Sequence, residues 1–139
     1  MPEIDLAGLT TPVLTPFDEQ NRLDEFWYLH TLDWFKQSGV RRVLVNGTTS
    51  EFFSLTREER RQAFRLARDR FDGVVCYQAG SCSLADTREE ALWAQKYGAD
   101  AVVSLPPYYY AEAPPEGIID YFQQLGEDLK VPQIGRAHV

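Results

Sequence analysis

The sequence has no apolar run long enough to cross a membrane and no excess of positive charge. No stretch reaches the roughly 18 consecutive apolar residues of a membrane span. Its 14 lysines and arginines are outnumbered by 21 aspartates and glutamates, which gives a formal net charge of −7. A surface of this sign repels phosphate backbones and anionic lipids. We therefore expect neither a nucleic-acid partner nor a membrane association.

Cysteine is scarce as well, and the acidic N-terminus lacks the apolar core of a secretory signal. The two cysteines are Cys76 and Cys82. Without a partnering pair of histidines, their spacing matches no zinc motif, so we expect buried thiols. These absences favour a cytoplasmic protein without a metal or an organic cofactor.

Short apolar runs alternate with helix-like segments along the chain. The expected strands lie at 8–17, 43–45, 74–79, 100–105 and 131–134. The first expected helix begins at the N-cap Asp24 and ends at 38–39, and the other three span 57–71, 84–97 and 113–125. This alternation indicates a parallel sheet. Two folds use it: a doubly wound sheet, nearly complete at this length, or a (β/α)8 barrel, only half present because about 250 residues are typical.

The first expected helix has apolar residues at every third position, which predict its buried face. They are Phe26, Leu29, Leu32 and Phe35. His30 lies in the same helix, and we expect it at the surface or an edge rather than acting as a base.

Residues 45–56 are the most informative stretch. They follow the strand at 43–45 and end in a capping box, in which Thr56 and Glu59 satisfy each other's backbone donors. Turns of this kind are where α/β proteins place ligand groups. Thr48 and Thr49 offer adjacent hydroxyls beside backbone N–H groups, a cradle for a small anion such as a carboxylate. A capped loop without a ligand is the alternative, since threonine and serine are ordinary turn residues.

Three consecutive tyrosines, Tyr108, Tyr109 and Tyr110, follow the fourth expected strand at its carboxyl end. Three neighbouring rings cannot all face one core, so we expect at least one hydroxyl to point into the loop face. Ring packing with a satisfied hydroxyl is the alternative for any single one of them.

Several motifs occur in order: TPF at 15–17, GTTSE at 47–51, LTREER at 55–60, GADA at 98–101 and PYY at 107–109. From about residue 8 to 134, this spaced set resembles the dihydrodipicolinate synthase / N-acetylneuraminate lyase family of pyruvate-dependent aldolases. Asn46 and the tyrosine run resemble its 2-keto-3-deoxygluconate aldolase branch. The resemblance implies a TIM (β/α)8 barrel, of which the N-terminal half is present: about four βα units and the start of strand five.

The resemblance also implies roles. Thr48 and Thr49 match the pair that receives the pyruvate carboxylate, and Thr48 matches the hydroxyl of a proton relay. Tyr109 matches a tyrosine lent to that relay across a dimer interface, so a homo-oligomer (dimer or tetramer) is implied. Ser50 departs from the pattern, because the family usually has glycine there. If the position needs a positive φ, serine would strain the loop and shift the threonines.

The implied reaction makes or breaks a carbon–carbon bond between pyruvate, a keto acid, and an aldehyde through a Schiff base, as with a 2-keto-3-deoxy sugar acid. The alternative is 4-hydroxy-tetrahydrodipicolinate synthase, which condenses pyruvate with aspartate semialdehyde. The chemistry needs a lysine amine. Lys36 and Lys96 are expected in the last turns of helices, and Lys130 precedes the fifth strand. We therefore expect the nucleophile and a second tyrosine beyond residue 139, and a catalytically inactive fragment with only a carboxylate-binding loop.

The resemblance ends after 131–134. Residues 134–139 correspond, codon by codon, to one frame of a common sequencing adapter. We therefore expect 1–134 to be the N-terminal half of an aldolase-type barrel and 135–139 to be a non-native tail, with Ile134 ambiguous. His138 is then no candidate for a functional residue.

Overall fold

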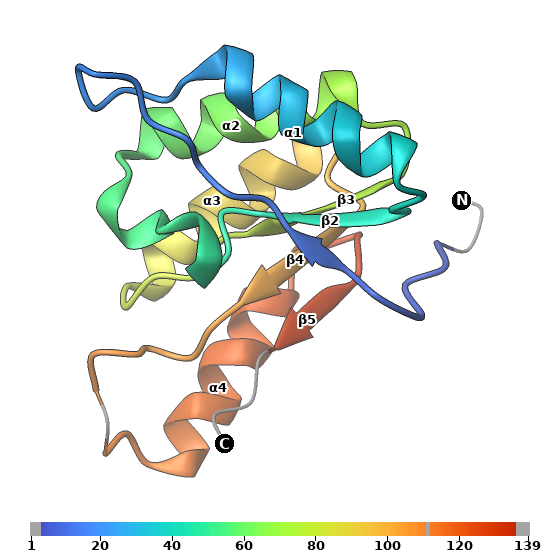
Figure 1. The fold of residues 1–139 in the computed structure, drawn as a ribbon. Helices are drawn as coiled ribbons and strands as arrows, with labels where there is room; N and C mark the ends of the chain where they lie inside the picture. Colours follow the sequence, from blue (N-terminus) through green and yellow to red (C-terminus); the bar gives the residue numbers. More distant parts are fainter. Residues whose placement is uncertain (1–3, 111, 136–139) are drawn as a thin grey trace. The chain divides into compact units, whose positions relative to one another are not determined.

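The computed structural model describes residues 4–110 and 112–135 (Figure 1). Strands and helices alternate along the chain as predicted. The strands are β1 (Thr11–Pro12), β2 (Arg42–Val45), β3 (Val74–Gln78), β4 (Ala101–Ser104) and β5 (Gln133–Gly135). The helices are α1 (Glu25–Gln37), α2 (Arg57–Arg70), α3 (Leu84–Lys96) and α4 (Pro115–Gly126). Among the described residues, no helix has the length and apolar character needed to cross a membrane.

The strands lie in the sheet in the order in which they occur in the sequence, β1-β2-β3-β4-β5. β1 pairs with β2 in parallel, and β4 pairs with β5 in parallel. A doubly wound sheet reverses its strand order at a switch point, whereas a (β/α)8 barrel adds each strand beside the previous one. The fold is therefore the N-terminal half of a TIM barrel, and the doubly wound alternative is excluded.

The described residues fall into two compact units, divided between Cys76 and Tyr77. In the first unit, α1 and α2 lie side by side (Figure 1). Both helices begin with a side-chain cap: Asp24 accepts a hydrogen bond from the backbone of Trp27, and Thr56 and Glu59 form the predicted capping box. The caps satisfy backbone donors that would otherwise lack partners, so local sequence fixes both helix starts.

The buried face of α1 differs from the prediction. Leu32 and Phe35 are buried as expected, but Phe26 is 71% exposed and Tyr28 is buried in its place. A step of three residues rotates about 300° around a helix, so a strict every-third pattern drifts off one face. The spacing of Tyr28, Leu32 and Phe35 keeps to a single stripe.

The first strand is much shorter than the predicted span 8–17. Only Thr11–Pro12 is paired as a strand, and the N–H of Val13 adds one further bond to the carbonyl of Leu44 at 3.0 Å. Pro12 and Pro16 have no N–H to donate, which limits a longer ladder.

In the second unit, α3 and α4 contact each other beside β4 and β5. Its buried apolar residues are Tyr77, Ala79, Ala91, Ala94, Ala99, Ala101, Val102, Tyr121 and Leu125. β5 begins two residues later than predicted and includes Gly135, which pairs with Ser104. The remainder of the expected non-native tail, with His138, lies outside the described residues.

Within the described part of the chain, neither cysteine forms a disulfide. Cys76 is buried as predicted, whereas Cys82 is only half-buried. Among the described residues, no group of three or more histidine, cysteine, aspartate or glutamate side chains is placed to hold a metal ion.

Candidate active site

The chain turns sharply where β2 ends. Asn46 follows β2 with a φ of 60°, in the left-handed region that asparagine tolerates better than most residues. Its side chain is buried, and its Nδ2 donates to the carbonyl of Arg60 at 3.0 Å. Because Arg60 lies in the first turn of α2, Asn46 joins the end of the strand to the start of the helix.

Thr48, Thr49 and Ser50 form a 3₁₀ turn. The N–H of Ser50 donates to the carbonyl of Gly47, and the N–H of Glu51 donates to that of Thr48, each at 3.0 Å. Thr48 and Thr49 are both exposed, whereas Ser50 is 2% exposed. The turn therefore presents the two predicted hydroxyls next to each other at the carboxyl end of a parallel strand.

Ser50 fastens this turn to the segment after β1. Its Oγ donates to the carbonyl of Val13, and the Oγ1 of Thr15 donates to the carbonyl of Ser50 at 2.9 Å. Ser50 is not among the residues with a positive φ; Asn46 and Glu51 take up the left-handed conformations on either side. The strain considered for serine at this position is therefore absent, and the hydroxyl instead finds a buried acceptor.

The three tyrosines after β4 are all exposed, with relative exposures of 44% for Tyr108, 81% for Tyr109 and 60% for Tyr110. The rings of Tyr109 and Tyr110 pack edge to face, with centroids 5.7 Å apart. The three rings do not all face one core, as predicted; a hydroxyl pointing into the loop face stays a prediction. The relay between Thr48 and a Tyr109 lent by a second subunit stays a prediction.

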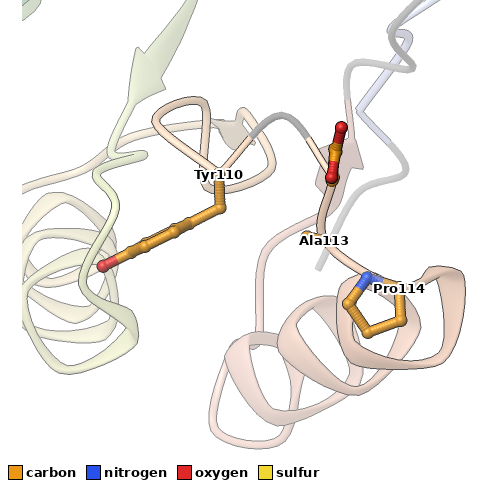
Figure 2. A pocket seen from close by; sticks show the side chains of 4 residues that line it. Tyr110, Ala113 and Pro114 are labelled. Carbon is orange, nitrogen blue, oxygen red and sulfur yellow. The ribbon is translucent and has the colours of Figure 1, made fainter.

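A pocket of about 570 Å³ lies beside this tyrosine run (Figure 2). Its lining consists of Tyr110, Glu112, Ala113 and Pro114. The ring of Tyr110 points away from Ala113 and Pro114 in this view (Figure 2). Among the described residues, the lining offers one carboxylate and one phenol beside apolar groups, and gathers no set of convergent donors.

The three lysines lie where the sequence predicts them. The Nζ of Lys36, in the last turn of α1, contacts the carboxylate of Asp72 at 2.8 Å and donates to the carbonyl of Arg70 at 3.1 Å. Lys96 ends α3, with its Nζ 5.8 Å from the centroid of the Tyr97 ring. Lys130 lies between α4 and β5. None of them is at the carboxyl end of a strand.

Sequence reasoning missed two polar residues in the second unit. Gln78 and Ser104 are the last residues of β3 and β4, and both are at least 98% buried. The Oε1 of Gln78 accepts from the N–H of Gly80, while its Nε2 has no partner among the described residues. A Cβ added at Gly80 would lie 3.2 Å from the Oγ of Ser104, so the two side chains border the same glycine. The sequence signal that could have identified both residues is a polar side chain at the end of an apolar strand.

Most of the chain is similar to known proteins. Residues 5–134 match the model of the Dihydrodipicolinate synthetase family. A 4-hydroxy-tetrahydrodipicolinate synthase of Bartonella quintana is 32% identical over 131 residues, which cover 93% of this chain and 44% of that protein. An uncharacterized DapA-like lyase of Pyrococcus abyssi is 31% identical over 133 residues, with the same two coverages.

Two solved structures extend the likeness to three dimensions. A prophage protein of the dihydrodipicolinic acid synthase family from E. coli, in complex with pyruvate, superposes with a TM-score of 0.88 at 29% identity, covering 94% of this chain and 44% of that one. A 2-keto-3-deoxygluconate aldolase variant of Sulfolobus solfataricus, also a pyruvate complex, gives 0.85 at 26% identity, covering 93% and 44%. The chain thus spans less than half the length of the proteins that it matches.

Proposed function

The chain belongs to the dihydrodipicolinate synthetase family, and from this membership we propose that the whole protein is a pyruvate-dependent aldolase or lyase. This chain would be the N-terminal half of its barrel, because it spans about 44% of the relatives' length. Pyruvate is the ligand of two of the structures that it resembles, which supports a keto acid as substrate.

One observation carries the proposal: the two exposed, adjacent threonines on the tethered turn after β2. In this proposal, Thr48 and Thr49 hydroxyls, with backbone N–H groups of the turn, hold the pyruvate carboxylate. Neutral donors on a short turn suit a small anion, because several hydrogen bonds reach the same two oxygens. The tether through Ser50 would keep these donors in place before the substrate arrives.

The proposed chemistry requires an amine that this chain does not place at the site. In the whole protein, a lysine amine would add to the C2 carbonyl of pyruvate, and loss of water would leave an imine. Loss of a methyl proton then gives an enamine, whose carbon attacks the aldehyde. Thr48 and Tyr109, the latter from a second subunit, would carry protons to and from the intermediates. No metal or organic cofactor enters these steps.

The second substrate has two candidates. A 2-keto-3-deoxy sugar acid, cleaved to pyruvate and an aldehyde, is favoured by Asn46 and the tyrosine run, and by the likeness to 2-keto-3-deoxygluconate aldolases. Condensation of pyruvate with aspartate semialdehyde is the alternative, since several synthases of that name are 32–33% identical to the chain. A third reading is a chain that binds a carboxylate and catalyses nothing.

Assay of the full-length gene product with pyruvate and each aldehyde separates these candidates. We expect condensation with glyceraldehyde at a higher kcat/KM than with aspartate semialdehyde. The reverse order would assign the protein to the synthase reaction. Absence of turnover with both aldehydes would overturn the proposed class of activity.

A further inference from the structure

The tyrosine segment, residues 105–114 between β4 and α4, has a pair of prolines at each end. Pro106 and Pro107 follow β4, and Pro114 and Pro115 lead into α4. Each proline fixes its own φ near −65° and restricts the residue before it. Both ends of the segment therefore lose few conformations when the chain folds.

Two backbone turns follow each other within this segment. The N–H of Tyr110 donates to the carbonyl of Pro107, and the N–H of Ala113 donates to that of Tyr110, each at 3.1 Å. Tyr109 lies inside the first turn, yet its side chain is 81% exposed. Backbone bonds, rather than burial in a core, therefore determine where the ring of Tyr109 lies.

The start of the tyrosine segment packs against the β3–α3 loop, residues 79–83. Gly80 belongs to this loop, and its N–H donates to the Oε1 of Gln78. A Cβ added at Gly80 would lie 2.7 Å from the backbone nitrogen of Leu105, closer than Cβ atoms approach in proteins. Only glycine fits at this position, so the loop contacts the backbone directly where the tyrosine segment begins.

The other end of the segment leads into α4, which Tyr121 fastens to the same loop. The hydroxyl of Tyr121 donates to the Oγ1 of Thr87 at 2.8 Å and to the carbonyl of Ser81 at 3.1 Å. The Oγ1 of Thr87 also accepts from the N–H of Ser81 and donates to the carbonyl of Ser83, each at 2.9 Å. A threonine hydroxyl has one proton and two lone pairs, so these bonds use all that Thr87 offers.

This hydrogen-bond network lies inside the compact unit Tyr77–Val139. Thr87 and Tyr121 are both buried, and hydrogen bonds away from water are stronger and hold their groups more rigidly. Each of these bonds joins two groups of the same unit. The network therefore needs no residue from the rest of a complete barrel.

We propose that Thr87 and Tyr121 are positioning residues, which hold the tyrosine segment so that Tyr109 reaches the proton relay of a second subunit. The inference rests on the proposed function, in which Tyr109 carries protons there. A ring that is lent to another subunit cannot be held by the core of its own, so its position depends on the ends of its segment. Because a displacement of about 1 Å can cost on the order of 100-fold in rate, a bond at the base of the segment can act on proton transfer without touching the substrate.

Steady-state kinetics of the full-length protein test the proposal. Tyr121→Phe and Thr87→Val each remove the hydrogen bond between α4 and α3. We expect kcat to fall about tenfold with KM for pyruvate retained, because the proposed carboxylate donors lie on a different turn. Thr87→Ser keeps the hydroxyl and should retain kcat.

Two comparisons separate positioning from a general loss of stability. In a Tyr109→Phe background the relay hydroxyl is already absent, so Tyr121→Phe should change kcat by less than about twofold. Leu125, the next buried residue of α4, provides the matched control: Leu125→Val loosens the packing of the same helix and should leave kcat unchanged. An equal loss of kcat from Leu125→Val, or an equal effect of Tyr121→Phe with and without the hydroxyl of Tyr109, would overturn the proposal.

Hydrogen exchange provides a readout that does not depend on catalysis. In Tyr121→Phe, peptides from the tyrosine segment should exchange at least about tenfold faster than in the unmodified protein, whereas those of α1 should not change. Unchanged exchange at 105–114 would overturn the inference whatever the activity. Faster exchange in a protein that turns over neither aldehyde would overturn the proposed function and still support the fastening of the segment by Tyr121.

Discussion

The Thr15 hydroxyl donates a hydrogen bond to the backbone carbonyl of Ser50 at 2.9 Å, across 35 residues of sequence. The hydroxyl of Ser50 in turn donates to the carbonyl of Val13. The turn that carries Thr48 and Thr49 is therefore tied to the segment after β1 by two bonds of opposite direction. Pairs of this kind hold a loop in one position before a ligand binds.

Replacing either end of this tether should loosen the turn. We expect Ser50→Ala to destabilise the full-length protein by about 1–2 kcal/mol, because it removes a buried hydrogen bond, and Thr15→Val by about 1 kcal/mol. The double variant should lose less free energy of unfolding than the two single variants added together, since both bonds hold one segment. Urea unfolding measures this, with the exposed Ser54→Ala as control; additive costs would argue against a shared tether.

Replacing each of the two threonines should have a different effect on the steady-state kinetics. Thr49→Val is expected to raise KM for pyruvate about tenfold with kcat retained, since it removes a hydrogen bond to a charged carboxylate. Thr48→Val should also lower kcat, by about 100-fold, if its hydroxyl carries protons. Steady-state kinetics of the full-length protein separates the two effects. Identical losses in both variants would contradict the assignment of a relay to Thr48.

The chain of 139 residues by itself should form no Schiff base. Lys36, Lys96 and Lys130 lie at helix ends or before a strand, and Lys36 is held by Asp72 and Arg70. Incubation with pyruvate, reduction with borohydride and mass spectrometry should therefore detect no stoichiometric adduct. The full-length protein, treated in the same way, is the positive control. An adduct on any of the three lysines would show that the nucleophile has been misplaced.

Two buried tyrosines differ in the hydrogen bonding of their hydroxyl groups. The hydroxyl of Tyr28 has no partner among the described residues, whereas that of Tyr121 donates to Thr87 Oγ1 at 2.8 Å and to the carbonyl of Ser81 at 3.1 Å. We therefore expect Tyr28→Phe to be neutral or stabilising by about 1 kcal/mol, and Tyr121→Phe to be destabilising by about 1–2 kcal/mol. Thermal unfolding of both variants checks the order; a large loss at Tyr28→Phe would reveal a partner for its hydroxyl.

Alkaline pH provides an independent measurement on Tyr28. Burial raises the pKa of its hydroxyl above the ordinary value of 10.0. Above pH 10 the unfolded chain therefore loses this proton while the folded chain keeps it, so the free energy of unfolding falls as pH rises. The expected slope is up to about 1.4 kcal/mol per pH unit for this group. Tyr28→Phe should remove that part of the slope, whereas Tyr121→Phe should not.

The open ends of the sheet should limit the stability of the chain alone. β1 and β5 are the outermost strands of the order, and each lacks a neighbour on one side among the described residues. Unpaired edges and the exposed aromatic groups favour aggregation. We expect this chain to aggregate or to remain partly unfolded. A sharp, cooperative calorimetric transition of a monodisperse monomer would contradict this prediction.

Local patterns were sufficient to predict much of the fold. The capping box at Thr56 and Glu59 depends on residues three apart, and the sequence fixes it without help from the rest of the chain. The alternation of strands and helices also follows from periodicity within each segment. The adjacent hydroxyls of Thr48 and Thr49 needed only a short turn, which the chain forms from its own backbone hydrogen bonds.

Contacts between distant residues decided the rest. Only packing against the core shows that α1 buries Tyr28 and exposes Phe26, because both positions are apolar and either could belong to a stripe. Ser50 reads as an ordinary turn residue until Val13 and Thr15, more than 30 positions earlier, meet it with an acceptor and a donor. Gln78 and Ser104 become neighbours only because β3 and β4 place both side chains beside Gly80. The sequence alone determined the order of helices, strands and turns, since these states depend mainly on near neighbours. The tertiary structure decided how far the outer strands β1 and β5 extend, and which side chains are buried, tethered or left open.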